Sequence, residues 1–237
     1  QEIKATVDTP TEKPKPPPKV EPKPVPPPKV EPKPRVDPFQ EQLMRETEQL
    51  TQRKQAEQEL SLLNRSLKML SACNEALVRA DNERELLNVI CQIAIDIGGY
   101  RMAWVGYAQD DAGRAITPMA YAGKEDGYLT EMKATWSEDE PSGMGPAGLA
   151  IRTGQASVFA DIALEPDSFH WLEAMRQRGY RGVISLPLRG RDRIFGVFIL
   201  YSAEVFHLTG KDLELLQEMA DDLAFGIGSI RSQVERK

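Results

Sequence analysis

The chain has 237 residues and a formal net charge of −6, so its length suits one or two domains. Residues 1–38 hold eight Lys or Arg and six Asp or Glu, a net charge of +2, which leaves −8 for the remainder. An acidic remainder without a basic stripe argues against nucleic-acid binding, and no apolar run reaches the length needed to span a membrane.

The first 38 residues contain 13 of the 18 prolines and almost no large hydrophobic side chains. The segment at 16–25 recurs at 26–35, and the two copies differ only where Val25 in the first corresponds to Arg35 in the second. Proline fixes φ and removes a hydrogen-bond donor, so we expect a disordered, extended Pro/Lys-rich linker over 1–38. The alternative is a ligand for a proline-recognition domain.

A long helix is predicted over residues 39–79, which contain neither Gly nor Pro and are rich in Gln, Glu, Leu, Lys and Arg. Leucines at 60, 63, 67, 70 and 77 follow alternating spacings of three and four, with Asn74 filling the gap between the last two, which is the pattern of a coiled-coil seam. The seam slips near 52–55, because Leu43 and Leu50 are out of phase with it. We expect a coiled coil over 39–67 and hence a homodimer. The alternative is a single amphipathic helix packed on its own domain.

The elements expected after this helix follow from caps, periodicity and turn residues. Asn82 and Glu85 resemble a capping box that opens a second helix, which Gly98 and Gly99 end. A second capping box, Thr209 to Asp212, opens a final amphipathic helix. Between the two helices we expect strands at 100–107, 116–122 and 156–162, short helices at 127–133, 146–153 and 169–178, and a hairpin at 182–202.

The hairpin at 182–202 consists of two runs that are apolar at nearly every position, joined by a charged turn that contains Gly190. A strand that is apolar on both sides needs both faces covered. The outer amphipathic helices are expected to cover one face of the sheet, and the middle segment to roof the other. The chain is therefore predicted to be α+β, with an antiparallel sheet, a helical layer and a roofed pocket, in a domain over 68–237.

Taken together, these segments resemble the GAF domain family across about residues 68–232. The residues that carry the resemblance are Leu86–Ile95, Tyr100–Tyr107, Gly148–Gly154, Tyr180–Leu188, Ile194–Ser202 and Leu213–Ala224. It implies a sheet of about six strands with helices on one face and a ligand pocket on the other. Arg53–Leu60 also resembles the linker that follows PAS domains in bacterial multi-sensor proteins.

The cofactors known for GAF domains find little support here. Bilin-binding members attach the chromophore through a cysteine in the roof segment, and no cysteine lies between Tyr100 and Lys237. The Asn-Lys-Phe-Asp-Glu signature of the cyclic-nucleotide-binding members is absent. Haem needs an axial ligand, for which His170 is the one candidate. The identity of any cofactor or ligand stays open.

Catalytic chemistry has few residues to draw on, because the chain contains two histidines and two cysteines. Neither Cys73 nor Cys91 lies in a Cys-x-x-Cys motif, and a His/Cys metal site cannot be assembled from them. A methionine-sulfoxide reductase of GAF fold would need cysteines near the pocket. Both cysteines lie in helices expected on the opposite face, so we expect no enzymatic activity.

The candidate pocket residues are aromatic or polarisable side chains of the middle segment, which could stack on a planar ligand. They are Tyr121, Trp136, Met144, Phe159, Phe169, His170, Trp171 and Tyr180. The alternative is that they fill this space as core. The glycine-rich stretch Gly143–Gly148 has no Lys/Ser pair for a phosphate, and we expect it to form a flexible lip of the pocket.

These features predict a sensory or regulatory GAF module of bacterial signal transduction, which binds a small molecule or dimerises to control an output module outside these residues. A histidine kinase or diguanylate cyclase is the kind of output module that the resemblance implies. The alternative is a scaffolding protein with a ligandless GAF fold and a Pro-rich spacer arm. We expect a cytoplasmic location, with a membrane tether upstream of Gln1 as an open possibility.

Overall fold

The computed structural model describes residues 37–166 and 170–236, with the backbone alone at His170. The expectations for the Pro-rich segment and for the side chains of Phe169 and His170 therefore lie outside the described residues. The chain divides into two compact units, 1–48 and 49–237. Helix α1 (Pro38–Arg79) contains the boundary between them.

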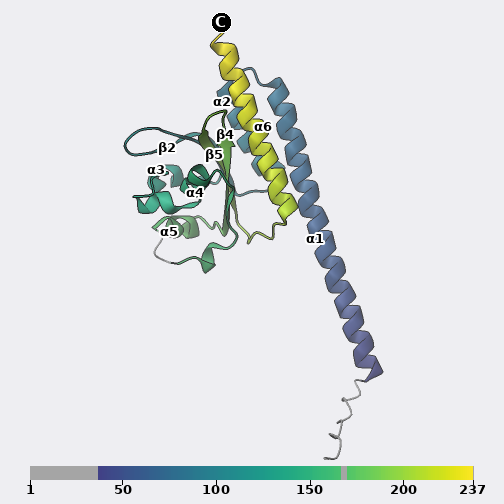
Figure 1. Ribbon diagram of the computed structural model, residues 1–237. Coiled ribbons are helices and arrows are strands. Elements are labelled where there is room, and N and C mark those ends of the chain that lie inside the picture. Colours follow the sequence, from purple (N-terminus) through teal and green to yellow (C-terminus); the bar gives the residue numbers. More distant parts are fainter. Residues whose placement is uncertain (1–36, 167–169, 237) are drawn as a thin grey trace, which may run out of the picture. The chain divides into compact units, whose positions relative to one another are not determined.

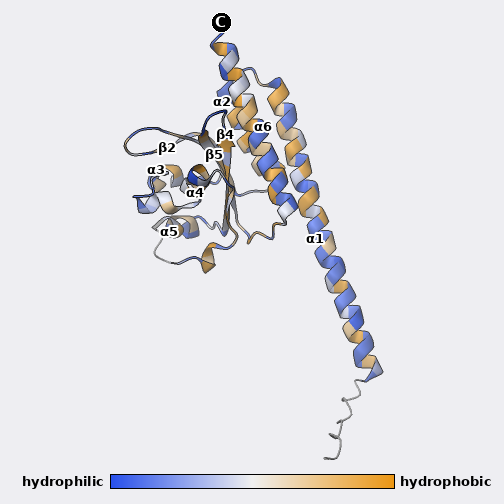
Figure 2. Cartoon of the chain, in the orientation of Figure 1, coloured by the Kyte–Doolittle hydropathy of each residue, from blue (hydrophilic) through white to orange (hydrophobic). Residues whose placement is uncertain are grey.

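In the first unit, residues 38–48 are helical and exposed, Leu43 and Met44 included. Most of this part of α1 has the colour of hydrophilic residues in Figure 2. Such a helix buries no apolar face of its own, so its stability must come from continuity with the next turns or from a partner.

The second unit is built on an antiparallel sheet of order β2-β1-β5-β4-β3. The strands are β1 (Met102–Ala108), β2 (Ile116–Gly123), β3 (Ser157–Phe159), β4 (Gly182–Arg189) and β5 (Ile194–Ser202). The predicted hairpin is β4–β5. Consecutive residues are buried over most of each strand, as expected for strands covered on both faces. The described residues form five strands, one fewer than the resemblance implies, and the edge strand β3 is short.

Helices α2 (Glu83–Asp96), α6 (Gly210–Val234) and the second-unit part of α1 lie on one side of the sheet (Figure 1). Both predicted helix starts are present. The side chain of Asn82 accepts a hydrogen bond from the Glu85 amide, and Thr209 and Asp212 form a complete capping box. Local sequence therefore fixes where the two helices that cover the sheet begin.

The opposite side of the sheet carries a roof of short elements (Figure 1). These are α3 (Tyr128–Met132), the 3₁₀ helix η1 (Pro141–Met144), α4 (Pro146–Thr153), the 3₁₀ helix η2 (Ile162–Leu164) and α5 (His170–Gln177). Gly154 ends α4 in the left-handed conformation, as its sequence predicts. Each of these roof helices is eight residues or shorter, so packing on the sheet and not helix propensity must hold the roof together.

Side chains that alternate along the strands divide the interior into two apolar clusters. Ala103, Val105, Phe198 and Leu200 face the helical layer, in a cluster that also holds Cys73 and Cys91. Trp104, Val197, Ile199 and Tyr201 face the roof. The alternation of side chains along a strand does not by itself decide whether Trp104 or Val105 faces the pocket side. In the structure it is Trp104.

The end of α6 is tied to the helix α2 and to the sheet by one polar cluster. Arg231 makes two hydrogen bonds of 2.7 Å to the carboxylate of Glu83, and the hydroxyl of Tyr107 donates to Glu83 at 2.6 Å. The Arg231 guanidinium also stacks on Tyr107 and Phe195, with its carbon 4.8 Å and 5.3 Å from the ring centres. Residues 148 positions apart in the chain are joined in this way.

This cluster makes stability depend on pH. Partial burial raises the pKa of Glu83, but the bonds from Arg231 and Tyr107 outweigh it, so the net pKa lies below the ordinary 4.5. A carboxylate whose pKa is lowered in the folded state stabilises the fold fully at any pH above its pKa in the unfolded state. That stabilisation is lost as the pH falls through the lower, folded-state pKa. Since Arg231 is 43% exposed, solvent screening limits the contribution of its ion pair with Glu83 to about 1 kcal/mol of unfolding free energy.

We therefore expect Glu83→Gln to lose about 1 kcal/mol of unfolding free energy at pH 7 and to match the parent protein near pH 3. Urea unfolding at both pH values measures this. The control is Glu75→Gln, which breaks a 2.7 Å pair with Arg79 whose partners are 60% and 77% exposed, and should change little. An equal loss at both pH values would exclude the ionic origin of the effect.

Candidate functional site

A small cavity of about 30 Å³ lies between the sheet and the roof. Two strands supply its floor, with Ser185 from β4 and Tyr201 from β5. The roof supplies the remaining lining residues, which are Tyr128, Met132, Ala134, Thr135, Ser142, Gly145, Pro146, Ala147 and Trp171. Pockets that bind small molecules usually measure about 300–1,000 Å³. The cavity is much smaller, so side chains fill most of the space under the roof.

Ser185 is the unusual residue of the floor. It is the one polar side chain among the apolar residues Gly182–Leu188, it is fully buried, and it faces the roof because it alternates with Ile184 and Leu186. Its hydroxyl has no hydrogen-bond partner among the described residues. A buried polar group without a partner is costly, and so it calls for an explanation.

Three tyrosines pack beside the cavity. The ring centre of Tyr128 lies 5.5 Å from that of Tyr180 and 5.4 Å from that of Tyr201, both edge to face. The hydroxyl of Tyr201 accepts a long bond from Trp104 and donates one to Tyr128, each 3.4 Å. Burial raises the pKa of Tyr201 to about 12 and that of Tyr128 well above 10.0, so both hydroxyls keep their protons at neutral pH.

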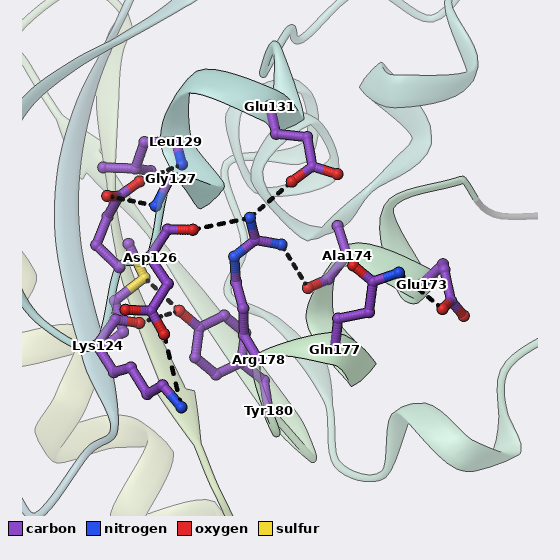
Figure 3. A network of polar contacts seen from close by, with 12 residues as sticks. Lys124, Asp126, Gly127, Leu129, Glu131, Glu173, Ala174, Gln177, Arg178 and Tyr180 are labelled. Atoms are coloured by element: carbon purple, nitrogen blue, oxygen red, sulfur yellow. Dashed lines mark hydrogen bonds and ion pairs between the residues drawn. The ribbon is translucent and has the colours of Figure 1, made fainter.

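Arg178 connects two helices of the roof, α3 and α5 (Figure 3). Its guanidinium donates to the carbonyl oxygens of Ala174 and Asp126, each at 3.0 Å, and to the Glu131 carboxylate at 2.6 Å. It also stacks on the Tyr128 ring, 5.3 Å from the ring centre. Since Glu131 and Tyr128 belong to α3 and Ala174 to α5, one 10%-exposed side chain joins both helices.

The hydroxyl of Tyr180 donates to the carbonyl oxygen of Lys124, next to the Arg178 network (Figure 3). This bond fixes the chain where β2 leads into α3. Tyr180 and Arg178 thus hold the same roof segment from two directions.

The glycine-rich stretch Gly143–Gly148 is tightly packed. A Cβ atom on Gly148 would lie 2.0 Å from the Gly143 carbonyl oxygen, and one on Gly143 would lie 1.8 Å from that of Ser137. Arg152 donates to the carbonyl oxygens of Gly143 and Trp136, at 2.7 and 2.9 Å. The backbone approach that only glycine allows, rather than a flexible lip, shapes this side of the pocket.

The predicted pocket residues are distributed over the roof, and among those described only Trp171 lines the cavity. Phe159 packs edge to face on Trp171, at 5.3 Å between ring centres. Tyr180 is buried behind Tyr128. Met144 is 42% exposed, and Tyr121, although opposite Trp104 in the sheet register, is 54% exposed on an edge strand.

Trp136, the remaining predicted residue, is half-buried beside the cavity. Its indole N–H donates to the Gln109 carbonyl oxygen at 3.0 Å, and Arg114 stacks on its ring. Sequence reasoning missed Tyr128, Ser185 and Tyr201. A lone serine in an all-apolar strand was the available signal for Ser185.

Within the described part of the chain, no charged side chain lines the cavity. Arg178 is directed away from it into its own network, and no metal-binding group of three or more His, Cys, Asp or Glu occurs within residues 37–166 and 170–236. The helices of those same residues include none that is long and apolar enough to cross a membrane. The site is thus a neutral space with hydroxyl groups on its walls.

Residues 80–228 match the family model described as GAF domain. The chain therefore belongs to the GAF domain family. No protein with a curated description matches it in sequence.

Several solved structures share the fold at low sequence identity. One is the GAF domain of a phosphoenolpyruvate-protein phosphotransferase from Coxiella burnetii, 18% identical, with a TM-score of 0.58 over 73% of this chain and 98% of that one. Another is free methionine-R-sulfoxide reductase from Neisseria meningitidis with its substrate, 17% identical, TM-score 0.56, over 71% and 91%. A third belongs to a putative two-component sensor histidine kinase protein from Sinorhizobium meliloti, 15% identical, TM-score 0.51, over 64% and 94%.

The two cysteines of this GAF domain lie far from the cavity lining. Cys73 and Cys91 are free, buried and packed in the cluster between sheet and helices, on the opposite side of the sheet from the roof. Burial raises the pKa of each thiol to about 12, with Asp222 adding to the effect at Cys73. Such thiols are protonated and poorly nucleophilic at neutral pH.

Proposed function

We propose that this GAF domain is a non-catalytic sensory module, in which a small molecule bound under the roof changes the packing of the helical layer. The observation that carries the proposal is the shared backbone of β1 and β5. Trp104 and Tyr201 lie in the cluster on the roof side, where Tyr201 lines the cavity, while their neighbours Ala103 and Leu200 pack against the helices. A rearrangement at the pocket therefore moves strands on which α2 and α6 lie.

The Arg231 cluster gives this coupling a second route. Tyr107 lies near the end of the same strand β1 that carries Trp104, and it holds Glu83 and Arg231 of the two covering helices. A ligand shifts such an equilibrium only if it binds two arrangements with unequal affinity. We infer that the roof, built of short helices, is the part that differs between them.

Dimerisation through α1 is the other half of the proposal. Leu60 and Leu67 are 61% and 46% exposed, although they follow the heptad spacing of a seam. A further apolar groove of about 340 Å³ lies on the helical side. Its lining includes Ala72 and Ala76 of α1, Ala80 just after α1, and Leu86 and Val89 of α2. These surfaces are what a second copy of the chain would cover.

We expect sedimentation equilibrium to find a dimer, and the double change Leu60→Glu with Leu67→Glu to weaken association at least tenfold, because it places charge in the seam. The matched control is Leu164→Glu, which changes an 83%-exposed leucine of the roof and should leave association unaltered. A parent protein that stays monomeric at high concentration would contradict the dimer.

Ligand binding is tested independently by native mass spectrometry of protein purified from its source cells. A bound small molecule that dissociates on denaturation is expected. An empty protein under all growth conditions would contradict the sensory role.

One observation favours a second function, that of a scaffold with a ligandless GAF fold. The cavity is only about 30 Å³, and aromatic side chains fill the remainder of the space. In that case the Pro-rich arm would space or dock partners. The Ser185 hydroxyl, which has no partner among the described residues, favours the ligand-binding function instead.

An enzymatic role in the manner of the structurally similar methionine-R-sulfoxide reductase has less support. Its chemistry needs thiolates at the substrate. Buried, protonated Cys73 and Cys91 on the helical side of the sheet favour packing roles instead. Reductase activity that disappears on changing either cysteine would overturn our proposal.

A further inference from the structure

Hydrogen-bond donors converge on the cavity under the roof. Ser185 presents a fully buried hydroxyl without a partner among the described residues. The hydroxyl of Tyr128 accepts the long bond from Tyr201, which leaves its own proton available. Thr135, by contrast, is already engaged with the carbonyl oxygens of Gly113 and Arg114. Ser185 and Tyr128 therefore each have a buried hydroxyl proton that a ligand could use.

The start of α4 adds backbone donors. Gly145 is its N-cap and makes no side-chain cap. Gly145 and Ala147, whose backbone N–H groups can donate, line the cavity together with Pro146, which has no N–H. Amide groups in the first turn of a helix have no acceptor within the helix, and that end carries partial positive charge. A partner with an acceptor oxygen would satisfy these groups and the two hydroxyls together.

The surroundings do not favour a full charge on that partner. The cavity lining contains no charged side chain among residues 37–166 and 170–236, so a buried carboxylate or ammonium would have no counter-ion. The exposed acidic run Glu138–Glu140, just before η1, and the net charge of −6 of the chain oppose an anion further. A cation is not favoured either, because it needs hydrogen-bond acceptors and the groups described here are hydrogen-bond donors.

We propose that the pocket recognises an uncharged small molecule by an acceptor oxygen, of carbonyl or amide type, held by the Ser185 hydroxyl, the Tyr128 hydroxyl and the start of α4. The inference rests on the proposed sensory function and names its ligand class. Because the cavity of about 30 Å³ accommodates only the polar head of such a ligand, the rest displaces part of the roof.

Three probes of the same shape and different charge test this, namely acetamide, acetate and acetamidinium. Each is titrated into the full chain while amide resonances are followed by NMR. Acetamide should shift the signals of Ala147, Gly148 and Ser185 with a millimolar or weaker Kd, as expected for about four heavy atoms. Its Kd should be at least about tenfold lower than that of acetate, and acetamidinium should leave these signals unchanged.

Two variants assign the contact. Ser185→Ala should weaken acetamide binding about three- to tenfold, the range for one hydrogen bond, while leaving Tm unchanged or higher, because the lost hydroxyl had no partner in the described part of the protein. Tyr128→Phe should weaken it by a similar factor. Ser61→Ala, an exposed serine of α1, is the control and should change nothing.

The outcomes separate this inference from the function it rests on. If acetate or acetamidinium binds at these residues as tightly as acetamide, the ligand class is overturned while ligand binding stands. If no probe shifts them, or if Ser185→Ala and Tyr128→Phe both bind acetamide as the parent does, the assigned contact is wrong. The sensory role is then still decided by the molecule found in native mass spectrometry.

Discussion

Gly148→Ala is expected to destabilise the domain by about 3 kcal/mol and to lower Tm by roughly 6–12 °C. The added Cβ would lie 2.0 Å from the carbonyl oxygen of Gly143, a backbone atom that cannot turn aside as a side chain could. Either η1 or α4 must move, and Gly143 is itself pressed against Ser137. The displacement would open the side of the roof that Gly145 and Ala147 contribute to the cavity.

Thermal unfolding and urea titration measure this loss, and Gly228→Ala is the matched control. Gly228 lies in α6, and a Cβ atom added there would meet none of the described atoms within 4 Å, so alanine should stabilise by up to about 1 kcal/mol. If Gly148→Ala were as stable as the parent protein, close backbone packing would not be the reason why glycines occur in the stretch Gly143–Gly148.

Arg178→Ala is expected to cost about 3 kcal/mol, since it removes three hydrogen bonds and a stacking contact from a 10%-exposed side chain. The carbonyl oxygens of Ala174 and Asp126 would lose a charged donor. Glu131 is 56% exposed and can be hydrated, which keeps the loss below that of a fully buried pair.

The roof should respond to Arg178→Ala more than the helical layer does. Hydrogen exchange should become faster in peptides covering 124–132 and 170–178, with α6 unchanged. Arg178→Lys should restore less than half of the stability, because an ammonium group cannot reproduce the planar set of donors. If exchange rose equally in α6, Arg178 would be a general stabilising residue and not a fastening of the roof.

Arg181→Ala is the control for this series. Arg181 lies three residues further along and pairs with Asp161 at 3.0 Å, with 49% of its side chain exposed. A pair of this kind contributes little, so we expect a loss of no more than about 1 kcal/mol. If Arg181→Ala lost as much unfolding free energy as Arg178→Ala, the burial of Arg178 would not explain its larger contribution.

Elements governed by local signals were predictable. The caps at Asn82 and Thr209 and the stop at Gly154 satisfy backbone groups within a few residues, so short stretches of sequence encode them. The hairpin of β4 and β5 was predictable for a related reason. Strands apolar on both sides have one stable solution, which is to be covered on both faces.

The pocket was not predictable in the same way. Ser185, Tyr201 and Tyr128 come from two strands and a roof helix, and they meet through sheet register and the placement of α3. Tyr121 has the correct strand parity, yet it lies at an edge where it stays 54% exposed. Aromatic character alone could not distinguish the lining residue Trp171 from Tyr180, which packs behind Tyr128.

By itself, the sequence determined the family, the α+β architecture, the helix boundaries and the two-sided burial of the central hairpin, because periodicity and capping act over a few residues. Only the tertiary structure decided which side chains border the cavity and how small that cavity is. It also decided that Arg178 joins two roof helices and that Ser185 has no partner among the described residues. Those properties arise between segments distant in the chain, where packing sets the geometry and no local pattern records it.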